Sequence, residues 1–298
     1  MSDASWFFEF PAMPKETLRA LKKGFDVGYR DFSRAYGEVI ENFFDPLLSF
    51  LVWFEGLFLG SPWWLVIVVL AGLAWFASHS WKVVAGVVTA FLAIGFFGMW
   101  EDTMSTMAMI TVCTVLSIVI GLPIGILMSR YERAQSIITP VLDVMQTMPS
   151  FVYLIPVVML LGIGKVPGLL AVVIYAIAPM IRLTNLGIRL VDREVLEAAD
   201  SFGASYWQRL LGVQIPLAMP NIMAGINQTI MMALAMVVIA SMIGVKGLGQ
   251  PVLKAVTNQY FALGLFNGLA IVALAIVFDR VTQAYGRRLQ SSRQISHD

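Results

Sequence analysis

Residues 103–129 read TMSTMAMITVCTVLSIVIGLPIGILMS, a long run without a charged side chain. A helix needs about 20 mostly apolar residues to cross a bilayer, so this run predicts a membrane-spanning helix. Six further long, mostly apolar runs are residues 56–78, 83–100, 144–164, 166–181, 210–245 and 255–278. The sequence therefore predicts an all-α, polytopic membrane bundle of about seven transmembrane helices.

The composition of the whole chain supports this class. Of its 298 residues 58% are apolar and 13% are charged, whereas soluble domains carry about 45–50% apolar and about 25% charged residues. These values exclude a disordered chain and disfavour a soluble globule. The net charge of +1 predicts no nucleic-acid partner. Two histidines and one cysteine make a His/Cys metal site improbable, and we expect none.

The charge distribution divides the chain into three parts. Residues 1–60 form a predicted N-terminal tail in which basic and acidic side chains alternate. Within it residues 43–59 begin FFDPLLSFLVWFEGLF, and we expect an amphipathic segment in the membrane interface, with an eighth span as the alternative. Residues 61–280 are the predicted transmembrane domain, and residues 281–298 are the predicted C-terminal tail.

Basic residues in the short loops predict the orientation, because cytoplasmic loops carry an excess of Lys and Arg. The loops on one side contain only Lys165, Lys246 and Lys254. The loops on the other side and the C-terminal tail contain Lys82, Arg130, Arg133, Arg182, Arg189, Arg193, Arg209, Arg280, Arg287, Arg288 and Arg293. We therefore expect the C-terminus to be cytoplasmic and the N-terminal tail to lie outside.

The most charged of the predicted cytoplasmic loops is residues 182–217. Asp192 is placed to cap a helix, and Gly203 follows at the position of a C-terminal cap. A second short helix is expected over 205–211, and Pro216 then precedes the next predicted span. Helix, glycine turn and helix predict a stiff elbow between two membrane spans.

This loop resembles the EAA loop of ABC importer permeases. The likeness rests on Glu197-Ala198-Ala199, on Gly203 after three intervening residues, and on the closing Val213-Gln214-Ile215-Pro216, where the family usually has Ile-x-Leu-Pro. In that family the loop docks into a cytoplasmic ATPase. The resemblance implies that the ATPase-coupling residues are Glu197, Ala198, Ala199, Gly203, Ile215 and Pro216.

Further segments narrow the resemblance to the permease subunits of glycine betaine/proline betaine/choline importers. These segments are residues 146–153, 162–168, 182–184, 201–205 and 236–249, and the likeness covers roughly residues 100–290. It implies a multi-pass subunit of the bacterial cytoplasmic (inner) membrane that imports an osmoprotective quaternary amine. It also implies a homodimer, an extracytoplasmic substrate-binding protein, and ATPase subunits that bind ATP and Mg²⁺, with no cofactor in this chain.

Two other functions stay open. One is an ABC permease for another small amino acid or amine. The other is an ion-coupled secondary transporter, which is disfavoured because Asp143 and Asp279 lie only at predicted span ends. The sequence contains no Walker-type phosphate loop and no histidine beside a nucleophile, so we expect no enzyme activity.

Polar groups within the spans suggest a translocation pathway. Asn227 and Gln228 lie deep in an uncharged run, where exposing amides to lipid is costly. Met231 follows one helical turn later. These three residues are the predicted pathway lining, and the segment from Met148 to Tyr153 is the second candidate.

Overall fold

The computed structural model describes residues 12–294, and residues 1–11 and 295–298 of the two predicted tails lie outside this range. The described part is built of helices and contains no strand, which confirms the all-α prediction. The α-helices are α1 Lys15–Gly60, α2 Trp63–Ser78, α3 Trp81–Phe96, α4 Trp100–Arg130, α5 Glu132–Thr147, α6 Ser150–Leu161, α7 Lys165–Arg189, α8 Arg193–Ser201, α9 Tyr206–Arg209, α10 Ile215–Ala240, α11 Gly249–Asn258 and α12 Phe261–Gln294.

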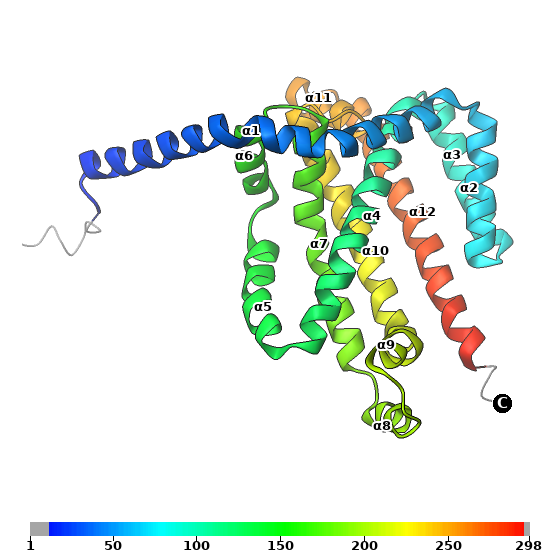
Figure 1. Cartoon of the computed structure of the whole chain (residues 1–298). Coiled ribbons are helices and arrows are strands. Elements are labelled where there is room, and N and C mark those ends of the chain that lie inside the picture. Colours follow the sequence, from blue (N-terminus) through cyan, green and yellow to red (C-terminus); the bar gives the residue numbers. More distant parts are fainter. Residues whose placement is uncertain (1–11, 295–298) are drawn as a thin grey trace, which may run out of the picture.

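The centre of the bundle is α7, which packs most extensively against α10 and α4 (Figure 1). Small residues allow these helices to approach closely, as is usual in membrane bundles. A Cβ atom added to Gly125 of α4 would lie 2.6 Å from Thr184 Cβ and 2.8 Å from the Ile181 carbonyl oxygen of α7. The Gly121–Gly125 pair therefore serves helix packing.

Within the described residues, five helical segments are long and apolar enough to cross a membrane, and a bent pair makes a sixth. The bent pair is α5 and α6, which meet at 101° just after Pro149. Two shorter apolar helices, α2 and α3, have 16 residues each, or about 24 Å at 1.5 Å per residue. The run 56–78 divides at Ser61-Pro62, where α1 ends and Pro62 stands at the N-cap of α2.

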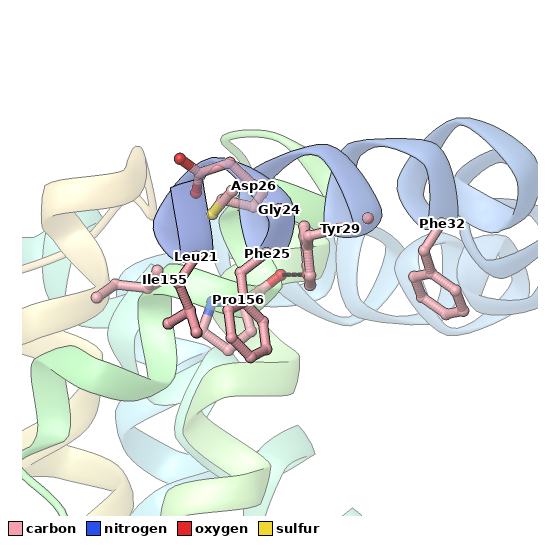
Figure 2. A pocket seen from close by; sticks show the side chains of 10 residues that line it. Leu21, Gly24, Phe25, Asp26, Tyr29, Phe32, Ile155 and Pro156 are labelled. Atoms are coloured by element: carbon pink, nitrogen blue, oxygen red, sulfur yellow. Dashed lines mark hydrogen bonds between the residues drawn. The ribbon is translucent and has the colours of Figure 1, made fainter. Parts of the chain in front are cut away.

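Helix α1 lies across the end of the bundle that is opposite α8, and its first half extends past α6 (Figure 1). Residues 43–59 belong to this helix, which continues back to Lys15 without a break. The Tyr29 hydroxyl donates a hydrogen bond to the Pro156 carbonyl oxygen of α6, beside an open cavity (Figure 2). Ser33 Oγ donates to the Met159 carbonyl oxygen at 3.2 Å. The Ser33 bond satisfies a carbonyl group in the last turn of α6, and both bonds tie α1 to α6.

An ion pair also fastens α1 to the central helices. Glu55 of α1 is 7% exposed and pairs with Lys165 at the start of α7. Ser105 Oγ of α4 donates a hydrogen bond of 2.8 Å to the same carboxylate. A single buried group thus connects three helices.

Replacing Glu55 with alanine is expected to lower stability by about 1–3 kcal/mol. This loss of stability is smaller than the usual cost of breaking a fully buried ion pair, because the Lys165 side chain is 28% exposed. Thermal unfolding in detergent measures the change, and a double replacement of Glu55 and Lys165 by methionine should recover most of the loss. Equal unfolding temperatures for the single variant and the wild type would contradict a stabilising role.

Candidate functional site

The predicted elbow is present as α8, a turn and α9, and it projects from one end of the bundle (Figure 1). The Asp192 side chain accepts a hydrogen bond from Glu194 N at 2.9 Å, which caps the start of α8 as predicted. At the other end Gly203 has φ +75°. The amide of Gly203 donates to Asp200 O at 2.9 Å, and the amide of Ala204 donates to Ala199 O at 3.1 Å. These two bonds form a Schellman motif, which requires the left-handed residue at Gly203.

The second half of the elbow is fixed to the first. Ser205 and Gln208 form a reciprocal capping box at the start of α9. Arg209 Nη1 donates to both carboxylate oxygens of Asp200, at 3.0 and 2.7 Å. Since Asp200 belongs to α8 and Arg209 to α9, this pair holds the two short helices at one angle.

The elbow is also joined firmly to the bundle. The Arg130 guanidinium carbon lies 4.1 Å from the centroid of the Tyr206 ring, a cation–π contact between α4 and α9. Leu210 is buried in a cluster with Ile188 of α7 and Ile222 of α10. A π-helical turn, Leu210–Gln214, then leads directly into α10. The elbow and α10 are therefore joined with no flexible linker between them.

The residues implied by the family resemblance lie on the elbow and at the start of α10. Glu197 and Ala198 are exposed on α8, and Ala199 is half-buried. Among the described side chains Glu197 has no ion-pair partner. Ile215 and Pro216 are half-buried at the start of α10, where proline suits the first turn.

Large apolar side chains on the elbow were missed by reasoning from the sequence. Phe202 is 92% exposed, Trp207 is 64% exposed and Leu211 is 60% exposed. Phe202 and Trp207 lie between the charged residues Asp200 and Arg209, and Leu211 follows shortly after Arg209. Large apolar side chains so close to charged residues were the available signal. Exposed aromatic residues on a rigid element are typical of a protein–protein contact surface.

The structure brings Asn227, Gln228 and Met231 together at a cavity of about 500 Å³ between α10 and α12. Asn227 Nδ2 donates a hydrogen bond of 2.9 Å to Asp279 Oδ1. Gln283 Nε2 donates to the same oxygen at 2.6 Å. The Asn227 side-chain oxygen is buried and has no partner among the described residues. The lining of the cavity thus combines side-chain amides, methionine sulfur and the guanidinium of Arg287, and Asp279 is a hydrogen-bond partner of two of the lining amides.

Met148 and Tyr153 lie apart from this cavity, at the bend between α5 and α6. Tyr153 is buried, its hydroxyl donates to the Met145 carbonyl oxygen, and its ring centroid is 5.7 Å from that of Tyr175 on α7. In Figure 1 α5 and α6 lie on one flank of α7, whereas α12 lies on the other. Within one chain the two candidate pathway segments are therefore separate.

Comparison with known proteins places these features in a family. Residues 117–291 match the family described as "Binding-protein-dependent transport system inner membrane component". The chain belongs to this family of transport proteins. The matched range contains the whole elbow together with α7, α10 and most of α12. It therefore includes both the elbow and the helices around the α10–α12 cavity.

Curated relatives of this inner membrane component cover most of its length. The glycine betaine/proline betaine transport system permease protein ProW of Escherichia coli (strain K12) is 51% identical over 83% of this chain and 69% of its own length. The glycine betaine/carnitine transport permease protein GbuB of Listeria monocytogenes is 45% identical over 85% of this chain and 90% of its own. These relatives are transport permease proteins and not enzymes.

The fold of the inner membrane component has a counterpart among solved structures. An inward-facing structure of the MetNI methionine ABC transporter superposes with a TM-score of 0.57 at 18% sequence identity. The match covers 62% of this chain and 93% of that one. Such a likeness supports the helical architecture.

Proposed function

We propose that this chain is the membrane-spanning permease subunit of an ATP-driven importer, and that its elbow docks into a cytoplasmic ATPase. The observation that carries the proposal is the elbow itself, a capped and internally clamped pair of helices with Phe202 and Trp207 exposed. A stiff projection with aromatic anchors suits a contact that must transmit force.

The proposed mechanism uses the connections of the elbow. Two ATPase subunits bind ATP and Mg²⁺ and close, which moves the elbows of a permease homodimer. The Asp200–Arg209 pair keeps α8 and α9 together during this movement. The direct join to α10 then shifts α10 against α7 and α12, and the pathway opens alternately to either side.

The substrates for which these relatives are named support a quaternary-amine cargo, and we propose glycine betaine or a related compound delivered by an extracytoplasmic binding protein. A quaternary ammonium ion has no N–H to donate, so it is attracted by oxygens and by polarisable groups. Another small amine or amino acid remains the second candidate cargo.

Uptake by proteoliposomes tests this function. The chain is reconstituted with its ATPase and binding protein, and radiolabelled glycine betaine uptake is followed with ATP or with an ion gradient alone. Uptake that needs ATP and the binding protein is expected. Uptake driven by the ion gradient without ATP would instead identify a secondary transporter.

Replacing Gln228 with leucine is expected to slow uptake roughly fivefold, since a lost hydrogen bond costs about 1 kcal/mol. Gln228 is exposed at the α10–α12 cavity and is the better test of the pathway, because Asn227 also holds Asp279. Basal ATP hydrolysis should persist, and Gln250→Leu on exposed α11 is the control. Normal uptake by the Gln228 variant would move the pathway towards Met148 and Tyr153.

The elbow end is proposed to be cytoplasmic, together with the C-terminus. Cysteine labelling of intact cells checks this orientation, because the native Cys113 is buried and should give little background. A cysteine at exposed Ser205 should react only after the membrane is permeabilised, whereas a cysteine at exposed Glu101 should react from outside. Labelling of both positions in intact cells would reject the proposed topology.

A further inference from the structure

A groove of about 440 Å³ is lined by residues of α3 and α12. These two helices lie on the α2 side of the bundle (Figure 1). Its walls are small and aliphatic, and include Gly86 and Ile276, while Lys82 and Arg280 complete the lining. The two helices run in opposite directions, because Arg288 of α12 donates a hydrogen bond to the Phe76 carbonyl oxygen just before the turn into α3. Both cations therefore lie at the same end of an apolar groove.

Neither cation is neutralised within the described part of the chain. Among the described residues Lys82 and Arg280 take part in no ion pair, and no side-chain hydrogen bond of theirs is present. Asp279, the acidic neighbour in sequence, is turned to α10, where it accepts hydrogen bonds from Asn227 and Gln283. Among residues 12–294, no carboxylate therefore pairs with the two cations at this end of the groove.

Tryptophans mark the level of this end in the membrane. The rings of Trp75 and Trp81 lie 4.9 Å apart beside the turn between α2 and α3. Trp63 and Trp64 lie at the opposite end of α2. Tryptophan gathers at both membrane interfaces, and α2 is about 24 Å long, close to the thickness of the hydrocarbon core. Lys82 follows Trp81 directly, which places it at headgroup level.

We propose that this groove binds one anionic phospholipid of the leaflet on the elbow side. An acyl chain lies along the α3 and α12 walls, and the phosphate is held between Lys82 and Arg280. Arginine suits phosphate because its guanidinium donates two parallel hydrogen bonds. Gly86 lines the groove, and a Cβ atom added there would have no protein atom within 4 Å. The space beside Gly86 is therefore empty of protein, and a larger side chain at this position would occupy part of the groove.

Native mass spectrometry of the full chain in detergent tests the site with phosphatidylglycerol and phosphatidylcholine as probes. The wild type should retain one phosphatidylglycerol per chain in preference to phosphatidylcholine. Lys82→Gln with Arg280→Gln should weaken that retention roughly 30-fold, since each cation near an anionic surface contributes about 1 kcal/mol. Arg133→Gln, which removes an exposed cation at the start of α5, is the matched control and should change nothing.

A second variant tests the apolar part independently of charge. Gly86→Phe should fill the groove and abolish retention of phosphatidylglycerol while the variant remains monodisperse. Equal retention of both lipids by the wild type, or unchanged retention in both variants, would overturn the proposal. So would a disulfide-linked dimer of Gly86→Cys, because a second copy of the chain would then cover the groove.

Discussion

Replacing Gly203 with valine is expected to abolish solute uptake while the protein still folds and inserts into the membrane. Gly203 has φ +75°, and a β-branched residue there costs on the order of 1–3 kcal/mol. The position is otherwise open, because an added Cβ atom would meet no protein atom within 4 Å. The substitution therefore acts on the backbone alone, and it misplaces α8 relative to α9.

Gly203→Asn is the matched control, because asparagine tolerates the left-handed conformation much better than valine does. We expect this variant to retain a large part of the uptake. ATP-driven uptake by proteoliposomes and ATPase stimulation by the binding protein are measured together. Full uptake by the valine variant would refute the role of the elbow in coupling.

Replacing Phe202 with alanine is expected to weaken the complex with the ATPase by roughly 30-fold or more. Aromatic residues at the centre of protein interfaces often contribute about 2 kcal/mol or more. Phe202 is 92% exposed in the chain alone, so its removal costs little internal packing. Affinity of the purified permease for its ATPase, measured by titration in detergent, reports this change.

Phe261→Ala provides the comparison for this prediction. Phe261 is also highly exposed, but it starts α12, which Figure 1 shows to begin at the end of the bundle opposite the elbow. Its removal should leave the affinity for the ATPase unchanged. If both phenylalanine variants bound the ATPase as the wild type does, the docking surface would have to lie elsewhere.

Much of the fold could be predicted from the sequence, because uncharged runs and helix caps are local signals. The run 103–129 lies within α4, and Asp192 caps α8. The continuity of α1 was not predictable in this way. Its charged first half is typical of a solvated tail, and Pro46 lies inside the helix. Packing of Ser33 and Glu55 against α6, α4 and α7 holds this helix in place.

The two candidate sites, the elbow and the α10–α12 cavity, could be predicted from the sequence only in part. The predicted coupling residues follow a sequence motif, so a resemblance locates them without knowledge of distant contacts. Asp279 as the partner of Asn227 could not be found, because 52 residues separate them and only the packing of α10 on α12 brings them together. The exposure of Phe202 also depends on the tertiary structure, since its neighbours in sequence would equally allow a buried turn.

Hydrogen exchange of the permease with and without its ATPase is the most direct measurement of docking at the elbow. Binding of the ATPase should slow amide exchange across residues 193–209 far more than at α11, which lies at the opposite end of the bundle (Figure 1). The Phe202→Ala variant should lose this protection under the same conditions. Stable complex formation with unchanged exchange over residues 193–209 would contradict the elbow as the site where the ATPase binds.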